Sequence, residues 1–422
     1  RASILADELI HCEDLYLTVH VDAESEGLEG DSARFETVSW HDLVSNGDGA
    51  GHSASDRDIA AIFYTSGSTG KPKGVVLSHL NMVCGARSVA EYLKNESTDR
   101  LLAALPFSFD YGFSQLSTAF CSGASVALME YLWPKDVLRA AEKFAITGLA
   151  AVPPLWIQLA ELEWPDSVAQ RLRYITNSGG AMPVAVTEKL REALPSTDIY
   201  LMYGLTEAFR STYLPPAEVS RRPTSMGKAI PNAEILVVRP DGEPCEPGEI
   251  GELVHCGDLV SRGYWNDPER TAERFRPAPG NTSENSSQEL AVWSGDSVKM
   301  DEEGYLYFIG RKDDMIKTSG YRISPNEIEE VIYATGLAKE AVAIGVPHSV
   351  LGQAVVVVGV PETTGADAPD ELIADCQRAL PAFMVPRHVE WRESLPRNSN
   401  GKIDRKSLAG ELENLFGNDR DD

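Results

Sequence analysis

A glycine-rich loop between two short apolar segments constrains the fold of this chain more than any other feature. The loop runs from Tyr64 to Gly74 and contains three glycines, four serine or threonine hydroxyls and two lysines. It follows the apolar run Ile59–Phe63, which predicts a buried strand, and it precedes a second strand at Val75–Leu77 and a helix that begins near Ser78. Glycines let the backbone turn its N–H groups toward an anion, hydroxyls add donors, and lysine adds positive charge. The segment therefore predicts a phosphate-binding loop between two strands.

Two other interpretations of the loop fit its sequence less well. A P-loop carries Gly five residues before its Gly-Lys pair and Ser or Thr after it, whereas Thr65 and Pro72 hold those positions here. A flexible Gly/Ser linker rarely lies between two apolar strands or ends in Lys-Pro-Lys-Gly. A nucleotide site of another class is therefore expected.

Further motifs follow the loop along the chain. They are Asn177–Ala181, Tyr203–Glu207, Gly251–Leu253, Arg262–Trp265, Thr271–Phe275, Trp293–Asp296, Gly304–Asp314, Lys317–Ile323 and Asn400–Arg405. With the loop, they resemble the motifs of the adenylate-forming superfamily, in the superfamily's order, from residue 59 to residue 406. That superfamily comprises acyl-CoA ligases, adenylation domains of peptide synthetases and luciferases. The resemblance implies an α/β fold with a large N-terminal domain and a small, mobile α+β C-terminal domain.

The order of expected elements agrees with this organisation. Strands and helices alternate from about residue 58 to 205, and short strands with glycine turns predict a β-rich subdomain at about 225–310. We place the domain boundary at Arg311–Asp313, which gives an AMP-binding domain over 1–310 and a lid domain over 311–422. Only 63 residues precede the loop, fewer than the superfamily usually has, so we expect a truncated N-terminus.

Composition limits the partners and the compartment. The chain has 64 acidic and 38 basic residues and a net charge of −26, which argues against nucleic acids and anionic membranes as general partners. No apolar run reaches the roughly 18 residues that a membrane-spanning helix needs. The six cysteines are scattered without a Cys-x-x-Cys pair, which predicts free thiols in a reducing cytoplasm.

The resemblance implies a reaction in two halves. A carboxylate attacks the α-phosphate of ATP to give an acyl-adenylate and pyrophosphate, and a thiol then attacks the acyl carbon and releases AMP. Neither half needs a nucleophile from the protein. Catalysis depends instead on positioning and on stabilisation of charge.

The resemblance also assigns the nucleotide-binding residues. The β- and γ-phosphates are expected at Thr65, Ser66, Gly67, Ser68, Thr69, Gly70 and Lys73. Thr206 is expected at the α-phosphate, and Glu207 at Mg²⁺, a hard ion that prefers carboxylate oxygens. The adenosine part is expected at Gly179, Gly180, Ala181, Tyr203, Gly204, Asp296 and Arg311. Tyr203 offers a flat ring for stacking on adenine, and the Asp296 carboxylate can accept bonds from both ribose hydroxyls.

The lid domain is expected to serve both half-reactions. Lys402, at the tip of an Asn-Gly-Lys loop, would enter the closed site and neutralise the carboxylate and the α-phosphate. Gly320, Tyr321 and Arg322 would line the thiol channel, although a structural ion pair is an equal alternative for Arg322. The lid must then rotate between the two steps, and Asp313 occupies the hinge position.

The acyl pocket is where the sequence leaves alternatives open. Phe109 falls at the superfamily's aromatic gate, and Asp110 falls where amino-acid-activating domains place the aspartate that binds the substrate amine. A buried carboxylate without a partner is costly, so Asp110 requires one. The candidates are a substrate amine, Arg210 and a helix N-terminus.

The acceptor also has alternatives. Pro106–Gln115, Ala150–Leu159 and Tyr203–Pro216 resemble AMP-forming acyl-CoA ligases associated with the exosortase A system, and to a lesser degree stand-alone prolyl adenylation enzymes. We therefore expect ATP, Mg²⁺ and CoA to be used with a carboxylic acid. The alternative is activation of an amino acid such as proline and its transfer to the phosphopantetheine of a carrier protein. A catalytically silent adenylate-binding protein is disfavoured because Lys402 and Glu207 are both present.

Overall fold

The computed structural model describes residues 9, 11–21, 35–46, 53–65, 72–279, 290–311, 314–319, 321–362, 369–398 and 402–416. Its contacts divide the chain into two units, Arg1–Ser55 and Asp56–Asp422. The first unit contains two parallel strands and a helix, β1 (Leu17–His20), β2 (Glu36–Ser39) and α2 (Trp40–Asn46).

The two strands and the helix predicted on either side of the glycine-rich segment are confirmed. Strands β3 (Ile59–Thr65) and β4 (Lys73–Ser78) form an antiparallel pair in which Thr65 lies opposite Lys73. Helix α3 (His79–Tyr92) follows at once. It begins with a capping box, because the Ser78 hydroxyl accepts a bond from the Asn81 N–H and the Asn81 amide oxygen accepts one from the Ser78 N–H.

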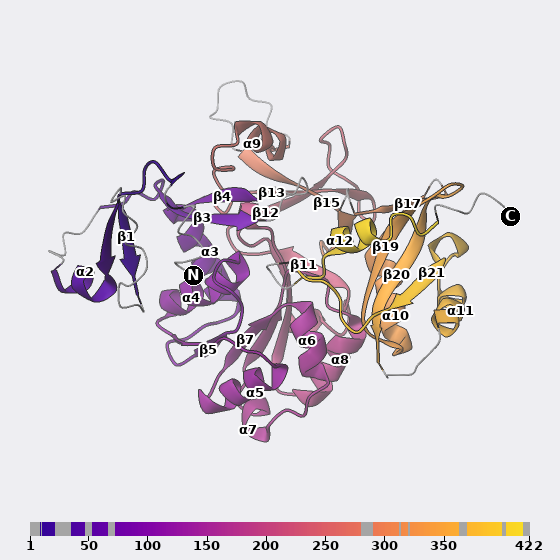
Figure 1. Ribbon diagram of the computed structural model, residues 1–422, viewed down its shortest axis with the longest axis horizontal. Helices are drawn as coiled ribbons and strands as arrows, with labels where there is room; N and C mark the ends of the chain where they lie inside the picture. Colours follow the sequence, from indigo (N-terminus) through magenta and orange to yellow (C-terminus); the bar gives the residue numbers. More distant parts are fainter. Residues whose placement is uncertain are drawn as a thin grey trace. The chain divides into compact units, whose positions relative to one another are not determined.

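A 12-stranded sheet forms the centre of the second unit (Figure 1). Its parallel half consists of β5 (Arg100–Ala103), β6 (Ser125–Leu128), β7 (Gly148–Ala151), β8 (Tyr174–Asn177) and β9 (Asp198–Tyr203). Its antiparallel half consists of β10 (Thr212–Leu214), β11 (Ser225–Ala229), β12 (Glu234–Val238), β13 (Ile250–Cys256), β14 (Phe275–Pro277), β15 (Leu290–Met300) and β16 (Leu306–Arg311). The strands expected at about 225–310 thus continue the α/β sheet, because β10 pairs with both β9 and β11.

Helices alternate with the parallel strands, as the sequence predicts. They are α4 (Asp110–Ser122), α5 (Pro134–Lys143), α6 (Pro153–Ala160), α7 (Asp166–Ala169) and α8 (Val184–Ala193). A short helix α9 (Pro268–Arg274) lies in the antiparallel half. Trp156 on α6 is fully buried, and its indole N–H donates to the carbonyls of Ala151 and Thr176 at the ends of β7 and β8. Parallel strands covered in this way are apolar on both faces, as the fully buried Gly-Leu-Ala-Ala sequence of β7 illustrates.

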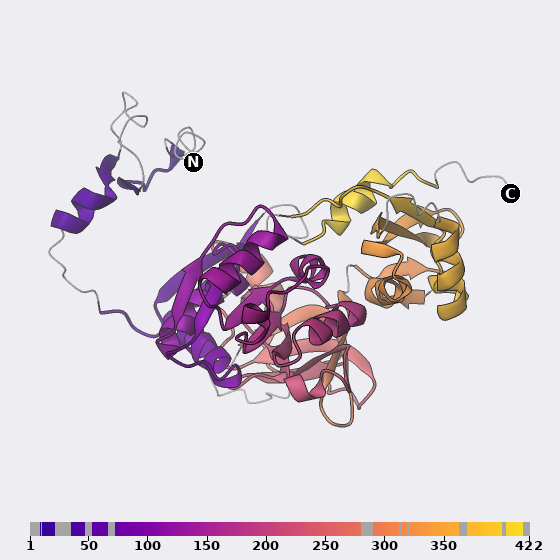
Figure 2. The ribbon, with the colours of Figure 1, turned by 90° about the horizontal axis from the view of Figure 1, so that it is seen from below.

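A separate five-stranded sheet follows residue 314. Its strands are β17 (Ile316–Thr318), β18 (Tyr321–Ile323), β19 (Ala338–His348), β20 (Gly352–Pro361) and β21 (His388–Trp391). Helices α10 (Pro325–Thr335) and α11 (Pro369–Ala379) pack on one face, and α12 (Arg405–Glu411) packs on the other. Alternate residues of β19 therefore enter two different apolar cores, with Ala343 in one and Val342 in the other. Figure 2 shows this part of the chain in orange and yellow, as a sheet flanked by helices.

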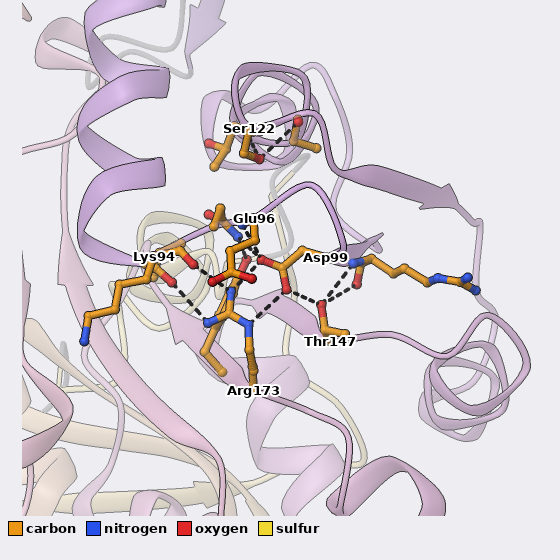
Figure 3. Close-up of polar contacts among 12 residues, drawn as sticks. Lys94, Glu96, Asp99, Ser122, Thr147 and Arg173 are labelled. Atoms are coloured by element: carbon orange, nitrogen blue, oxygen red, sulfur yellow. Dashed lines mark hydrogen bonds and ion pairs between the residues drawn. The ribbon is translucent and has the colours of Figure 1, made fainter.

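A polar network joins the N-terminal ends of three parallel strands (Figure 3). The Asp99 carboxylate, just before β5, accepts bonds from Arg173 Nε at 2.9 Å and from the Thr147 hydroxyl at 2.7 Å. Arg173 precedes β8 and Thr147 precedes β7. Arg173 also donates to the Lys94 carbonyl at 3.2 Å. This network fixes one edge of the parallel sheet and leaves the other edge for the loops that carry the expected site residues.

Two sequence expectations concern thiols and membranes. None of the six cysteines forms a disulfide in the structure, in agreement with the sequence. Among the described residues, no helix has both the length and the apolar character needed to cross a bilayer.

Candidate active site

The expected site residues lie where parallel strands end. Asp110 follows β5, Gly179 follows β8, and Thr206 follows β9 in a single 3₁₀ turn, η1 (Thr206–Ala208). Because β5, β7, β8 and β9 are parallel, their carboxyl ends meet at one edge of the sheet. Ligands of open α/β sheets bind at this edge, beyond the carboxyl ends of the strands.

The described part of the phosphate site is organised around Glu207. Lys73 Nζ lies 3.7 Å from Glu207 Oε1, and the Tyr264 hydroxyl donates to the same oxygen at 2.6 Å. Lys73 also donates to the Tyr264 hydroxyl at 3.3 Å. Thr65 lies opposite Lys73 in the hairpin. The other phosphate-loop predictions, Ser66, Gly67, Ser68, Thr69 and Gly70, fall outside the described residues.

Tyr264 was not predicted as a site residue. Its only signal in the sequence is its place in the motif Arg262–Trp265, which gives no indication that its hydroxyl reaches Glu207, 57 residues away.

The charges of this cluster are set by burial and by its partners. Burial raises the pKa of the Glu207 carboxyl, but the Tyr264 hydrogen bond and the Lys73 charge outweigh that effect and hold its pKa below the ordinary value. Burial lowers the pKa of Lys73, and the Glu207 charge offsets only part of the change. Glu207 is therefore a buried anion held by a hydroxyl and an ammonium group.

The donor set around Glu207 fits Mg²⁺ that is bound together with a phosphate ligand. No group of three or more His, Cys, Asp or Glu side chains that could hold a metal occurs in the described ranges. Mg²⁺ usually takes one or two carboxylates and completes its shell with phosphate oxygens and water, so a lone buried carboxylate suffices. Tyr264 and Lys73 both contact Oε1, and we expect the ion at Oε2.

The predicted adenosine residues Tyr203, Asp296 and Arg311 are brought together. Asp296 on β15 lies opposite Arg311 on β16. The Tyr203 hydroxyl donates to Asp296 Oδ2 at 2.5 Å, and Arg311 Nε donates to Oδ1 at 3.0 Å. The Asp296 charge raises the pKa of Arg311 above its ordinary value, so the guanidinium keeps its charge beside the nucleotide site. Ribose hydroxyls would have to replace or share these two donors.

The glycine motif after β8 lies beside Lys402. Gly179 has φ +84, a conformation that L side chains rarely adopt, and a Cβ there would lie 3.2 Å from Lys402 Cε. Asn177 Nδ2 donates to the Gly180 carbonyl at 3.0 Å and holds the turn, while Ala181 is exposed. Gly179 thus supplies both a turn and the space that Lys402 occupies.

Lys402 lies beside Phe109 and Gly179. Its Nζ is 5.7 Å from the centre of the Phe109 ring. Burial lowers the pKa of Lys402, and the charge of Asp110 offsets part of that change. The Lys402 backbone N–H donates to Asn398 Oδ1 at 3.1 Å. Helix α10 also contacts helix α8, because the Glu330 carboxylate accepts a bond from the Val184 N–H at 3.0 Å.

Of the predicted thiol-channel residues, the structure describes the side chain of Tyr321. Tyr321 is exposed on β18 and stacks on Phe383 with ring centres 4.1 Å apart. The hinge candidate Asp313, Gly320 and the side chain of Arg322 lie outside the described residues. Their roles stay predictions.

The partner of Asp110 is Arg210. Asp110 is the first residue of α4, and its Oδ2 accepts a bond from an Arg210 Nη at 3.0 Å, while Oδ1 accepts one from the Thr206 hydroxyl at 3.1 Å. The carboxylate also lies in the first helical turn, where the helix dipole favours a negative charge. Two of the three candidate partners are therefore present without a substrate.

Comparison with known families agrees with the arrangement of the site. Residues 4–265 match the family model described as AMP-binding enzyme, and residues 327–402 match the model described as AMP-binding enzyme C-terminal domain.

Two curated relatives illustrate the range of similar proteins. Tyrocidine synthase 3 of Brevibacillus parabrevis is 35% identical over 365 residues, which cover 83% of this chain and 5% of that protein. A long-chain-fatty-acid–CoA ligase of Bacillus subtilis is 31% identical over 363 residues, which cover 84% of this chain and 62% of the ligase. The chain therefore spans less than two thirds of the length of either relative.

Solved structures share the fold. ATP-bound MatB from Rhodopseudomonas palustris superposes with a TM-score of 0.83 at 25% identity, covering 98% of this chain and 82% of that one. The o-succinylbenzoate coenzyme A synthetase of Bacillus subtilis, in complex with ATP and a magnesium ion, gives 0.77 at 27% identity, covering 95% and 81%. The expected adenylate-forming fold is thus confirmed.

Proposed function

The chain belongs to the AMP-binding enzyme family, and from that premise we propose that it activates a carboxylic acid with ATP and transfers the acyl group to CoA. In the first step a carboxylate oxygen bonds to the α-phosphorus, and the bond to pyrophosphate breaks. In the second step the thiol sulfur bonds to the acyl carbon, and AMP leaves with the oxygen.

The placement of Lys402 is the observation that carries this proposal. A lysine from the small domain lies beside Phe109 and Gly179, at the edge of the sheet where Thr206 and Asp110 also lie. An ammonium group there can neutralise the acid's carboxylate and the α-phosphate as negative charge gathers between them. Thr206 would hold the α-phosphate.

The charged residues expected to bind the nucleotide support ATP and Mg²⁺ as cofactors. Lys73 and Glu207 form a charged pair at the end of the phosphate hairpin, and Asp296 with Arg311 forms a second pair for the ribose. Two solved relatives are described as ATP-bound, one of them with a magnesium ion. Mg²⁺ at Glu207 would neutralise phosphate charge in the transition state.

The acceptor assignment rests on the relatives and on the acyl pocket. A curated relative that covers most of this chain is a CoA ligase, and Asp110 is already paired with Arg210. The alternative is the loading of a carrier protein, and the similarity to tyrocidine synthase 3 supports it. Rotation of the lid about Asp313 would bring Gly320, Tyr321 and Arg322 to the thiol channel. We also propose a cytoplasmic location, which agrees with six cysteines that form no disulfide.

The two half-reactions can be tested separately in Lys402→Ala. We expect ATP–pyrophosphate exchange to fall by about 100-fold or more, because the variant loses the charge that stabilises adenylate formation. Thioester formation from a supplied acyl-adenylate should stay within about threefold of the wild type, since that step does not use Lys402. Lys339→Ala, which removes an exposed lysine of β19, is the matched control.

Two outcomes would contradict the proposal. Equal loss of both half-reactions would assign Lys402 a role in folding or in both steps. Absence of exchange in the wild type with fatty, aryl and amino acids, proline included, would exclude acid activation altogether.

A further inference from the structure

A buried ion pair closes the acyl side of the site. Asp110 is 4% exposed and Arg210 is 2% exposed. One Nη of Arg210 donates to Asp110 Oδ2 at 3.0 Å, and the other donates to the Ser114 hydroxyl at 3.0 Å. The guanidinium carbon lies 4.7 Å from the centre of the Tyr111 ring. Arg210 is therefore held on several sides by α4.

The backbone before Arg210 is built to place it there. Phe209 has φ +55 and ψ −52, and the Arg210 N–H donates to the Ala208 carbonyl at 2.6 Å, which forms a strained γ-turn. The Phe209 ring is fully buried against α3, where a Cβ at Gly85 would lie 2.2 Å from its Cδ1. A strained turn of this kind persists only when the surrounding structure holds it, and Gly85 provides the space.

The pair lies close to the residues that we propose for the reacting carboxylate. Asp110 shares a hydrogen bond with Thr206, which we place at the α-phosphate, and its charge acts on Lys402, which we place at the acid. We place the carboxylate of the acid beside Lys402 and Thr206, and its next carbon on the side of Asp110. A group on that carbon therefore meets the Asp110–Arg210 pair.

We propose that Arg210 is a specificity-determining residue that occupies the place of a substrate amine, so that the enzyme activates carboxylic acids without an amino group beside the carboxylate. This inference rests on the proposed function and names its substrate class. An ammonium group would find Asp110 already neutralised and would lie near two further positive charges, Arg210 and Lys402. A like charge so close is strongly unfavourable in a buried site.

An uncharged polar group at this place would not meet the same charge repulsion. Within the described part of the chain, Arg210 Nε is buried without a hydrogen-bond partner, so the guanidinium keeps one donor. A hydroxyl oxygen can accept from such a donor, whereas an ammonium group cannot. Arg210 should thus discriminate by charge rather than by size or polarity.

Matched acids give a direct test in ATP–pyrophosphate exchange. Each triplet has an alkanoate, its 2-hydroxy analogue and its 2-amino analogue, with three to six carbons, and cyclopentanecarboxylate is paired with proline. In the wild type we expect kcat/KM for the amino acid to be about 100-fold or more below that of the hydroxy acid. Arg210→Lys should keep this order, because it keeps the charge.

The variants separate a role in specificity from one in structure. Arg210→Met frees Asp110 for an ammonium group, so the gap between amino and hydroxy acids should narrow by about tenfold or more. In the double variant Asp110→Asn with Arg210→Met, the gap between amino and hydroxy acids should not narrow, because no carboxylate remains to pair with the ammonium group. A purely structural residue would lower the rates with all three acids alike.

Every result bears on the inference. A wild type that prefers the amino acid, or that rejects hydroxy and amino acids equally, overturns it and leaves acid activation standing. An unchanged gap in Arg210→Met also overturns it, and if that variant does not fold, the wild type and Arg210→Lys decide. Absence of exchange with every acid overturns the proposed function and this inference with it.

Discussion

Among the residues that the structure describes, three pairs of opposite charges surround the proposed reaction centre, and each carries a role that depends on single atoms. Lys73 pairs with Glu207, Arg311 with Asp296, and Arg210 with Asp110. Buried charges need such partners, because an isolated charge loses its hydration without compensation. Removal of one member therefore leaves the charge of its partner without compensation for the lost hydration.

The Tyr264 hydroxyl offers a test at this scale. In Tyr264→Phe we expect exchange at limiting Mg²⁺ to fall by about tenfold or more, and more Mg²⁺ to be needed for the half-maximal rate, because Glu207 loses the donor that orients it. Tyr213→Phe is the control, since it removes a hydroxyl from a residue that stacks on Tyr92, away from Glu207. An unchanged Mg²⁺ dependence in Tyr264→Phe would argue against Glu207 as the metal ligand.

Helix α3 shows how an element is adapted to the site beside it. A glycine in the middle of a helix usually costs about 1 kcal/mol relative to alanine. Gly85 is kept free of a Cβ by the Phe209 ring, which lies 2.2 Å from the position a Cβ would take. The helix thus contains a residue of low helix propensity, and the space beside this residue allows the γ-turn before Arg210 to form.

Replacement of a helical glycine by alanine usually stabilises a protein, but Gly85→Ala should destabilise this one. We expect the free energy of unfolding to fall by about 1–3 kcal/mol, because the Phe209 ring must move, and exchange activity to fall with it. Gly410→Ala on α12 is the matched control, since nothing lies within 4 Å of its added Cβ, and it should be neutral or stabilising. Denaturant unfolding measures both, and a stabilised Gly85→Ala would show that the ring adapts without strain.

Local sequence patterns predicted the helices and strands well, but they did not predict contacts between distant segments of the chain. The strands at Ile59–Phe63 and Val75–Leu77 were found, although they extend to Thr65 and from Lys73. Capping at Ser78 could be read from adjacent residues. The contact of Tyr264 with Glu207 could not, because it joins distant segments.

The same limit applies to Asp110 and to the sheet. The sequence showed that Asp110 needs a partner, but three partners satisfied that requirement until the turn at Phe209 placed Arg210. Pairing of β10 with β11, which makes one sheet of the α/β and β-rich segments, also depends on contacts that no local pattern encodes.

The molecule as a whole places its polar network and its proposed chemistry at opposite edges of the parallel sheet. Burial raises the pKa of Asp99, but its bonds to Arg173 and Thr147 outweigh burial and lower its pKa from 3.8 to about 2. Asp99 therefore contributes stability above pH 3.8 that is lost as the pH falls toward about 2.

Asp99→Asn should remove this contribution. We expect the free energy of unfolding at pH 7 to fall by about 2 kcal/mol, since Arg173 loses its anionic partner. The difference from the wild type should shrink as the pH approaches about 2, where Asp99 is itself protonated. Asp198→Asn, at the exposed start of β9, is the control. Parallel stability curves for wild type and Asp99→Asn across this range would contradict the assigned shift.

The separation of the two edges has a consequence for how such a protein can diversify. The Asp99 network holds the beginnings of the strands, and the loops at their far ends carry no part of it. Substitutions in those loops can thus alter substrate preference without removing a member of the Asp99 network. Selection for a new acid and selection for the Asp99 network act on different residues, so descendants of this chain can change their substrate while they inherit this network.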